Sequence, residues 1–328
     1  MAAYLVRRLA YGVLTIFGVL LLLFVLFFAV TDPDDIARKA VGERARPEVY
    51  LQWKKNHGYD KPMLLNREHG LTDAGRYTDT LLFEHFRRSL TFDFGRSDAG
   101  DEPIAKRLWE GAGPSLSLTV PLFALGLAIG ILVALFVALF RETYIDAGVL
   151  VACIITMSVS GLLFIIGGQF LVGLLLKWFP ISGFDPNAAV MARFLALPVL
   201  IGLVVGFGPD VRLFRTIFVE EMNRDYVRTA RAKGAGDARV MLGHVFRNAL
   251  IPILTNVVIA IPFLFTGALI LESFFGIPGL GSLTVDAIHA NDFSTLRTMV
   301  FLGALLFILG QMLTDVSYAL ADPRVRFS

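Results

Sequence analysis

The stretch from residue 115 to residue 140, SLSLTVPLFALGLAIGILVALFVALF, decides the fold class of this chain. It carries no charged side chain over 26 residues. A helix needs about 20 mainly apolar residues to cross a hydrocarbon core of about 30 Å. The stretch therefore predicts a transmembrane helix, and the rest of the sequence is best understood from it.

Five other segments have the same character, and the whole chain is 55% hydrophobic with a mean hydropathy of +0.66. Such a composition indicates lipid as the solvent of much of the surface. We therefore expect an all-α membrane protein with six spans. The spans are expected at about 9–30, 115–140, 147–176, 194–218, 249–271 and 298–320. The fourth is the least regular, because Gly206, Gly208 and Pro209 interrupt it.

The first span follows Arg7 and Arg8 and contains an apolar run of about 22 residues. The apolar core of a secretion signal is shorter, about 7–15 residues, so this segment is expected to stay in the membrane. Basic residues in short loops set orientation. The 210–247 loop has eight of them, which predicts that this loop and both termini are cytoplasmic.

The same orientation places residues 31–114 outside, with 14 basic and 15 acidic residues in mixed order. This segment is expected to form a small folded extracytoplasmic insert. The predicted organisation is an N-terminal span at 1–30, the insert at 31–114, a core at 115–320 and a cytoplasmic tail at 321–328. The core would contain a cytoplasmic segment at 219–248.

The sequence lacks the motifs that several common kinds of functional site require. Cys153 is the only cysteine, no lysine follows a glycine, and neither HExxH nor GxSxG occurs. The chain therefore lacks an intramolecular disulfide, a phosphate-binding loop and the usual hydrolase nucleophile. A net charge of +2 does not favour nucleic-acid binding. We expect no catalytic residue, no metal and no cofactor on this chain.

One basic segment, RDYVRTARAKGAGDARVMLGHVFRNALIP at 224–252, interrupts the apolar sequence. The spacing of Val219, Met222, Tyr226 and Ala230 predicts one helix face, and Gly234 and Gly236 end that helix. Asp237 is expected to cap a second helix, whose inner side would carry the residues that follow. These are Val240, Met241, His244, Val245 and Asn248.

Three interpretations of this basic segment compete. It could anchor the loop to anionic headgroups, or lie on the membrane as an amphipathic helix. Neither requires a tight glycine turn, whereas a short helix presented end-on suits a groove on a partner protein.

The segment DYVRTARAKGAGDARVMLGHVFRNALIP resembles the coupling segment of ABC-importer permeases of the dipeptide/oligopeptide family. YLVRRLAYGVLTIFGVLLLLFVLFF, HGYDKPMLLN, GALILESFFGIPGLGSLTVDAIHANDFSTLR and YALADPRVR resemble other parts of these permeases, in the same order. FDFG and RVRF favour the Yej-type peptide permeases. Ser160 and Gly161 stand where relatives often carry a proline.

The resemblance implies a six-span type I ABC importer permease bundle in a bacterial inner membrane. It also implies the partners: a homologous second permease, two ATPase subunits that hold ATP and Mg, and an extracytoplasmic peptide-binding protein. The residues that would seat in the ATPase are Arg228, Thr229, Ala230, Arg231, Ala232, Lys233 and Gly234. Gly234 would adopt a positive φ there.

At the outer face, GIPGLG predicts a rigid turn, and the resemblance implies an outer gate or a binding-protein surface. The residues concerned are Glu272, Pro278, Gly279 and Gly281. Glu272 is either a solvated carboxylate or a residue of the gate. Gln169 and Asn256 are expected to form hydrogen bonds between helices.

Import of di- or oligopeptides is the leading functional hypothesis, and nickel, glutathione or a modified peptide are alternative solutes. A carrier or channel acting alone would prefer buried charges within its spans, and the expected span interiors are almost free of charge, with Asp315 close to the cytoplasmic end. A membrane scaffold or sensor without transport is a further alternative. ATP dependence and solute flux separate these possibilities.

Overall fold

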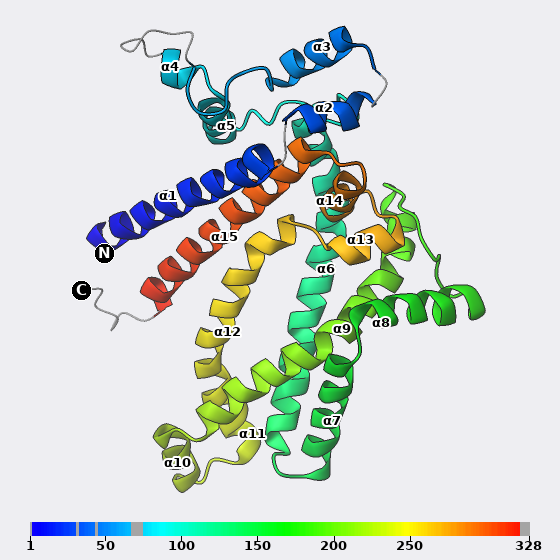
Figure 1. Cartoon of the computed structure of the whole chain (residues 1–328). Coiled ribbons are helices and arrows are strands. Elements are labelled where there is room, and N and C mark those ends of the chain that lie inside the picture. Colours follow the sequence, from blue (N-terminus) through cyan, green and yellow to red (C-terminus); the bar gives the residue numbers. More distant parts are fainter. Residues whose placement is uncertain (1, 31–32, 43–44, 67–74, 322–328) are drawn as a thin grey trace.

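A computed structural model of the chain describes residues 2–30, 33–42, 45–66 and 75–321, and within them every regular element is helical (Figure 1). Their bounds, in chain order, are α1 Ala2–Phe24, η1 Val25–Val30, α2 Pro33–Val41, α3 Pro47–His57, α4 Gly75–Thr78, α5 Leu81–Leu90, α6 Ile104–Leu139, α7 Tyr144–Ser158, α8 Gly161–Gly168, η2 Gln169–Leu175, α9 Ala188–Met222, α10 Asp225–Ala232, α11 Asp237–Val240, η3 Met241–Val245, α12 Phe246–Ala260, η4 Ile261–Phe265, α13 Leu269–Phe275, α14 Leu280–His289 and α15 Phe293–Ala321. The expected all-α class is confirmed.

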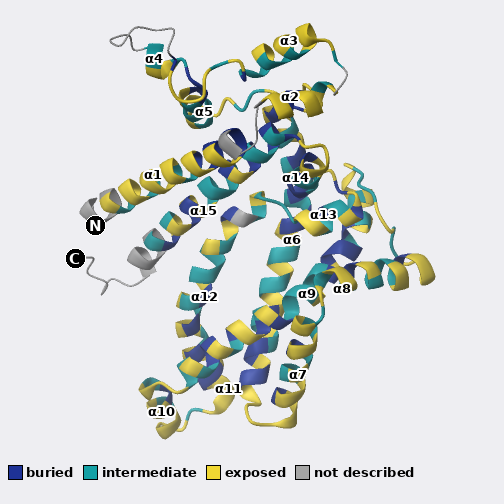
Figure 2. Ribbon diagram, viewed as in Figure 1, coloured by how far each residue is buried: buried dark blue, intermediate teal, exposed yellow. Residues whose placement is uncertain are grey.

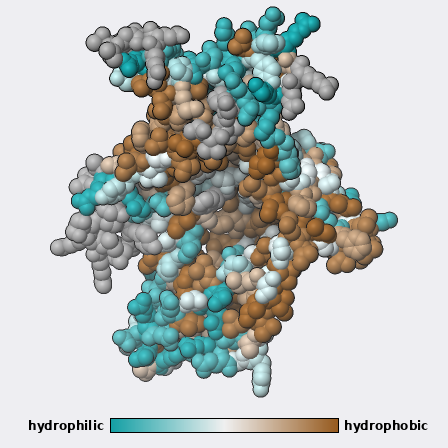
Figure 3. Space-filling view, viewed as in Figure 1, coloured by the Kyte–Doolittle hydropathy of each residue, from teal (hydrophilic) through white to brown (hydrophobic). Residues whose placement is uncertain are grey.

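The described residues contain between five and seven candidate membrane spans. Five are long apolar helical segments: Arg7–Phe28, Ile104–Leu139, Ala188–Met222, Asp237–Ala260 and Phe293–Asp315. Two more are pairs of short helices, α7 with α8 and η2, and α13 with α14, bent by 91° and 81°. Figure 3 shows the hydrophobic surface as a band between two hydrophilic ends, as a bilayer requires.

The predicted third span, 147–176, is not one straight helix. Val159 and Ser160 adopt extended backbone angles, with ψ of 133° and 136°, and these end α7 before α8 begins. The arm formed by α8 and η2 therefore points away from α7 (Figure 1). The amide of Gln169 donates to the carbonyls of Ile181 and Phe274, at 3.2 and 3.0 Å. By contrast, Asn256 donates to Pro252 within its own helix, and among the described residues it makes no hydrogen bond to another helix.

The predicted interruption of the fourth span is also wrong, because α9 runs unbroken through Pro198 and Pro209 for 35 residues. A Cβ at Gly208 would lie 2.7 Å from the carbonyl oxygen of Cys153. Glycine here permits close packing of α7 on α9 and does not break the helix. One consequence is that Asp210 lies inside a candidate span, so the expectation that span interiors nearly lack charge needs correction.

The core of the bundle forms where α6 crosses α9, with α7 and α12 packed beside them. Figure 2 shows the buried residues concentrated at this crossing, while the outward faces of the helices are exposed. The first 11 residues of α6 precede the span predicted from residue 115. The helix therefore reaches from the core into the part of the chain expected to be the insert.

Residues of the insert are joined to the start of α15 by a buried polar cluster. Asp98 accepts from the backbone nitrogen and hydroxyl of Ser294, at 2.7 and 2.8 Å. Asp292 accepts from the Ser97 hydroxyl at 2.5 Å and from the Asp98 nitrogen at 3.0 Å. Burial raises the pKa of Asp98, against the opposing charge of Arg297. Because both carboxylates are buried and satisfied, the insert is fixed to the core at this point.

A partly buried histidine joins the insert to the first span. His85 of α5 donates from Nε2 to the carbonyl of Leu20 at 3.2 Å and packs against Phe24 and Phe28. Burial, helped by the charge of Arg297, lowers the pKa of His85 to about 4. The native insert therefore holds a neutral imidazole at pH 7.

We expect acid to weaken this contact. The pKa of His85 in the folded protein lies below its ordinary value of about 6.5. Its neutral ring therefore contributes its full stabilisation of the folded state above pH 6.5, and this contribution is lost as the pH falls toward 4. By pH 5 the loss should be about 2 kcal/mol in the free energy of unfolding. His85→Gln, which keeps a neutral donor, should remove this pH dependence. Thermal unfolding at pH 7.5 and pH 5 measures it, and identical pH responses of the two proteins would contradict it.

Candidate coupling surface and outer carboxylate cluster

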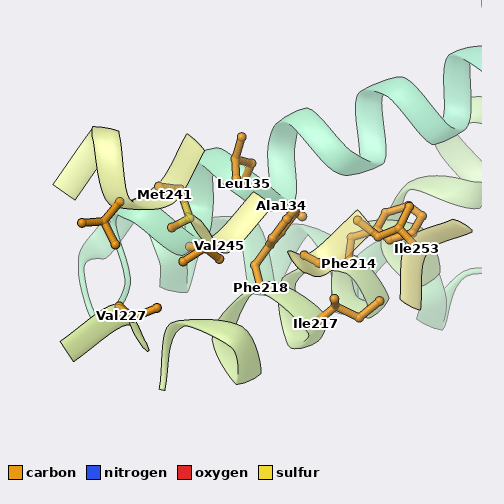
Figure 4. Packing of buried hydrophobic residues seen from close by; sticks show 12 residues of the cluster. Ala134, Leu135, Phe214, Ile217, Phe218, Val227, Met241, Val245 and Ile253 are labelled. Atoms are coloured by element: carbon orange, nitrogen blue, oxygen red, sulfur yellow. The ribbon is translucent and has the colours of Figure 1, made fainter. Parts of the chain in front are cut away.

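Helix α10, at the start of the basic segment, is attached to the bundle through one fully buried residue, Val227. Val227 of α10 is 0% exposed and belongs to a cluster with side chains from α6, α9, α11, η3 and α12. Figure 4 shows Val227 beside Met241 and Val245, with Phe218 of α9 and Leu135 of α6 in the same layer. Tyr226 and Ala230 pack against the cluster from the same side of α10. The position of α10 is therefore determined by the packing of α6 on α9.

The predicted helix face was only partly right. Met222, Tyr226 and Ala230 do face the core, but α9 ends at Met222 and α10 starts separately at Asp225. Val227, which the face did not include, is the residue that is fully buried. The signal available in the sequence was a single aliphatic residue between Tyr226 and Arg228 in a polar stretch.

The opposite side of α10 is open and basic. Ala230 alone of the predicted coupling residues is half-buried, and the others are exposed: Arg228, Thr229, Arg231, Ala232, Lys233 and Gly234. Arg228 lies 3.7 Å from Asp225, and Arg231 lies 3.2 Å from Asp237. Ion pairs at this exposure contribute little stability, so both guanidinium groups can exchange these partners for others.

Gly234 ends α10 in a Schellman motif. Its φ is +84°, its nitrogen donates to the Arg231 carbonyl, and the Ala235 nitrogen donates to the Ala230 carbonyl. A Cβ built at Gly234 would meet no other atom within 4 Å, so only the backbone angle requires glycine. The positive φ predicted for Gly234 is present.

The helix after the turn differs from the prediction in two respects. Gly236 is the N-cap of α11, while the Asp237 side chain accepts from Arg231 and caps nothing. A π-helical turn at Met241–Val245 then adds a residue, which shifts the inward face. As a result Val240, Met241 and Val245 are buried, but His244 and Asn248 are exposed.

At the other end of the molecule, Glu272 is the centre of a buried hydrogen-bond cluster. Its side chain is 0% exposed, so the expectation of a solvated carboxylate is wrong. One oxygen accepts from the Ser115 hydroxyl at 2.8 Å and the Ala268 nitrogen at 2.9 Å. The other accepts from the nitrogens of Gly281 and Ser282, at 2.7 and 3.1 Å. Four donors from three segments thus satisfy one carboxylate.

The glycines of the turn 276–281 make room for this carboxylate. A Cβ at Gly279 would overlap Glu272 and Ser115, and a Cβ at Gly281 would lie 2.7 Å from the Leu269 nitrogen. Pro278, at the tip, is exposed. The turn 276–281 is therefore packed tightly on its inner side and open on its outer side. Ser115, which the sequence reasoning overlooked, also accepts from the Leu280 nitrogen at 2.7 Å.

We expect Glu272→Gln to destabilise the protein. The glutamine amide would place an N–H donor where one carboxylate oxygen now accepts hydrogen bonds from two other donors. Because donors cannot bond to one another, we expect a loss of about 3 kcal/mol in the free energy of unfolding. Denaturant unfolding in detergent micelles measures it. Asp286→Asn in α14, where the side chain is exposed, is the charge-matched control and should unfold like the wild type. Equal stability of the two variants would show that the charge of Glu272 is dispensable.

Sequence comparisons relate the chain to membrane components of transport systems. Residues 126–327 match the family "Binding-protein-dependent transport system inner membrane component", and residues 1–77 match its N-terminal membrane component. A protein of Brucella abortus (strain 2308), named as a peptide transport system permease, is 32% identical over the full length of both chains. The glutathione transport system permease protein GsiC of Shigella flexneri serotype 5b is 29% identical, again over both full lengths.

These relatives do not specifically support the Yej type. The family matches and the full-length likeness are sufficient to assign the branch, and permeases of this family are transport subunits without a catalytic domain. The chain therefore belongs to the permeases of binding-protein-dependent ABC transport systems, in the branch that includes peptide and glutathione permeases, and is a multi-pass component of the inner membrane.

Proposed function

We propose that this chain is the permease subunit of an ATP-driven importer of di- or oligopeptides, and that it couples to the ATPases through residues 224–248. The observation that carries the proposal is the exposed basic side of α10, held by a buried valine on the α6–α9 core. A short, anchored helix with an open face suits a groove on a partner. Two ATPase subunits, with ATP and Mg, would supply the energy.

The anchoring gives the coupling a physical route. Closure of the ATPases would push on Arg228–Gly234, and the push would pass through Val227 to Phe218 and Leu135 in the core cluster. A close-packed core transmits displacement because it resists compression. In this mechanism the translocation path, formed with a second homologous permease, changes from inward-facing to outward-facing.

The proposed orientation puts both termini and α10 in the cytoplasm and the insert outside. The basic loop at 210–247 supports it through the distribution of Lys and Arg. An extracytoplasmic binding protein would then meet the insert and the turn 276–281, whose outer side is open. The outer-gate role of Glu272, Pro278, Gly279 and Gly281 belongs to this proposal.

Glutathione import is the second candidate, because relatives of the same length are named glutathione permeases. Reconstitution distinguishes the solutes. Proteoliposomes that hold this chain, its second permease and the ATPases should take up radiolabelled peptide only when ATP and the binding protein are both present. Uptake of glutathione in preference to peptides would favour the second candidate, and ATP-independent flux would contradict both.

Gly234 provides a sharper test of coupling. We expect Gly234→Val to leave the complex assembled but to lower transport at least about tenfold, because a β-branched residue disfavours the positive φ. Gly234→Asn, which tolerates that angle, should retain most transport. Gly236→Ala is the matched control, since Gly236 is exposed and has a φ of −66°. Co-purification and the ratio of ATP hydrolysed to peptide imported are measured, and normal import by the valine variant would refute the coupling role.

A further inference from the structure

A groove of about 350 Å³ lies between α6, α9 and α12. Its wall is mainly apolar, with Leu122 and Phe123 from α6, Leu203 and Phe214 from α9, and Leu264 beyond α12. The one ionisable residue in the wall is Asp210. At 1.5 Å per residue, Asp210 is about 18 Å from the C-terminal end of α9, which places it well inside the candidate span.

Asp210 has no partner among the residues that the structure describes. None of them donates a hydrogen bond to its carboxylate or places a cation within 4.0 Å of it. Three other acids in the candidate spans have partners. Asp146 binds Arg215 with two bonds of 2.8 and 2.7 Å, Asp315 pairs with Arg8, and Glu272 accepts its four hydrogen bonds.

The absence of a side chain on three neighbouring glycines keeps the space around Asp210 open. A Cβ at Gly126 or Gly206 would lie 3.6 or 3.4 Å from the Asp210 carboxylate oxygen. A Cβ at Gly130 would lie 3.2 Å from the Cβ of Asp210. Larger residues at these three positions would fill the part of the groove next to the Asp210 carboxylate. The small residues thus give a solute direct access to the acid.

We propose that Asp210 is a binding site for the ammonium group of the transported solute within the membrane. An acid in an apolar span is costly unless a cation or water satisfies it, so such residues mark solute pathways. A groove with apolar walls and one carboxylate complements a molecule that carries an amine beside apolar groups. This inference rests on the proposed function, and it identifies the free α-amino end of a peptide as the group that the path recognises.

A cation of the second permease is the alternative occupant. In that case Asp210 would hold the two permeases together, and its neutralisation would weaken assembly and affect all solutes equally. An ammonium-binding role predicts instead a loss that depends on the charge of the solute. The two roles therefore differ in a measurable way.

The test uses the purified complex of this chain, its second permease and the ATPases, in detergent, without the binding protein and without ATP. Binding of a radiolabelled tripeptide is compared with binding of the same peptide N-acetylated. The wild type should bind the free amine more tightly. Asp210→Asn should bind it about tenfold more weakly, the loss expected for a hydrogen bond between charged groups, and should leave the acetylated peptide unchanged.

Two variants keep the result interpretable. Asp210→Glu retains the charge and should keep the preference for the free amine, while Asp286→Asn removes an exposed charge elsewhere and should behave as wild type. Equal weakening for both peptides, loss of the second permease on purification, or a wild type without preference would overturn the inference. ATP-dependent uptake by the wild type, measured separately with the binding protein, tests the proposed function whatever Asp210 does.

Discussion

The packing of α6 against α9 is the constraint on which the rest of this structure depends. Both helices exceed 30 residues, and their contact supplies the buried surface to which α7, α12 and α10 attach. Small residues make the approach possible, as at Gly130, where a side chain would press on Phe214. Without that crossing, α10 would have no fixed position relative to the membrane.

Polar interactions fix the extremities of the molecule, while apolar packing forms its middle. Asp98 and Asp292 secure the residues between α1 and α6, and Glu272 secures the turn 276–281, in each case with several donors on one carboxylate. Such clusters are directional, so they define one geometry where apolar contacts would allow several. Asp210 departs from this pattern, because it is a carboxylate without protein donors in the described structure.

The sequence predicted the helical class, the position of most spans and the basic segment, because each depends on local composition over many residues. It did not predict the bend between α7 and α8, which depends on two extended residues, Val159 and Ser160. Pro209 does not break its helix as its sequence position suggests, since tertiary contacts keep α9 helical around it. The hydrogen-bond partners of Glu272 could not be predicted from local sequence either, because Ser115 lies 157 residues away along the chain. Whether α10 meets an ATPase remains a prediction.

The hydrogen bond from Ser115 to Glu272 has a mechanical consequence. Ser115 lies in the N-terminal part of α6, and Leu135 and Ala138 near its C-terminal end belong to the cluster that holds Val227. One continuous helix of 36 residues, about 54 Å long, thus connects the turn 276–281 to α10. Because α6 stays helical through Pro121, a shift of α10 along this axis would be transmitted along α6 toward the Glu272 cluster.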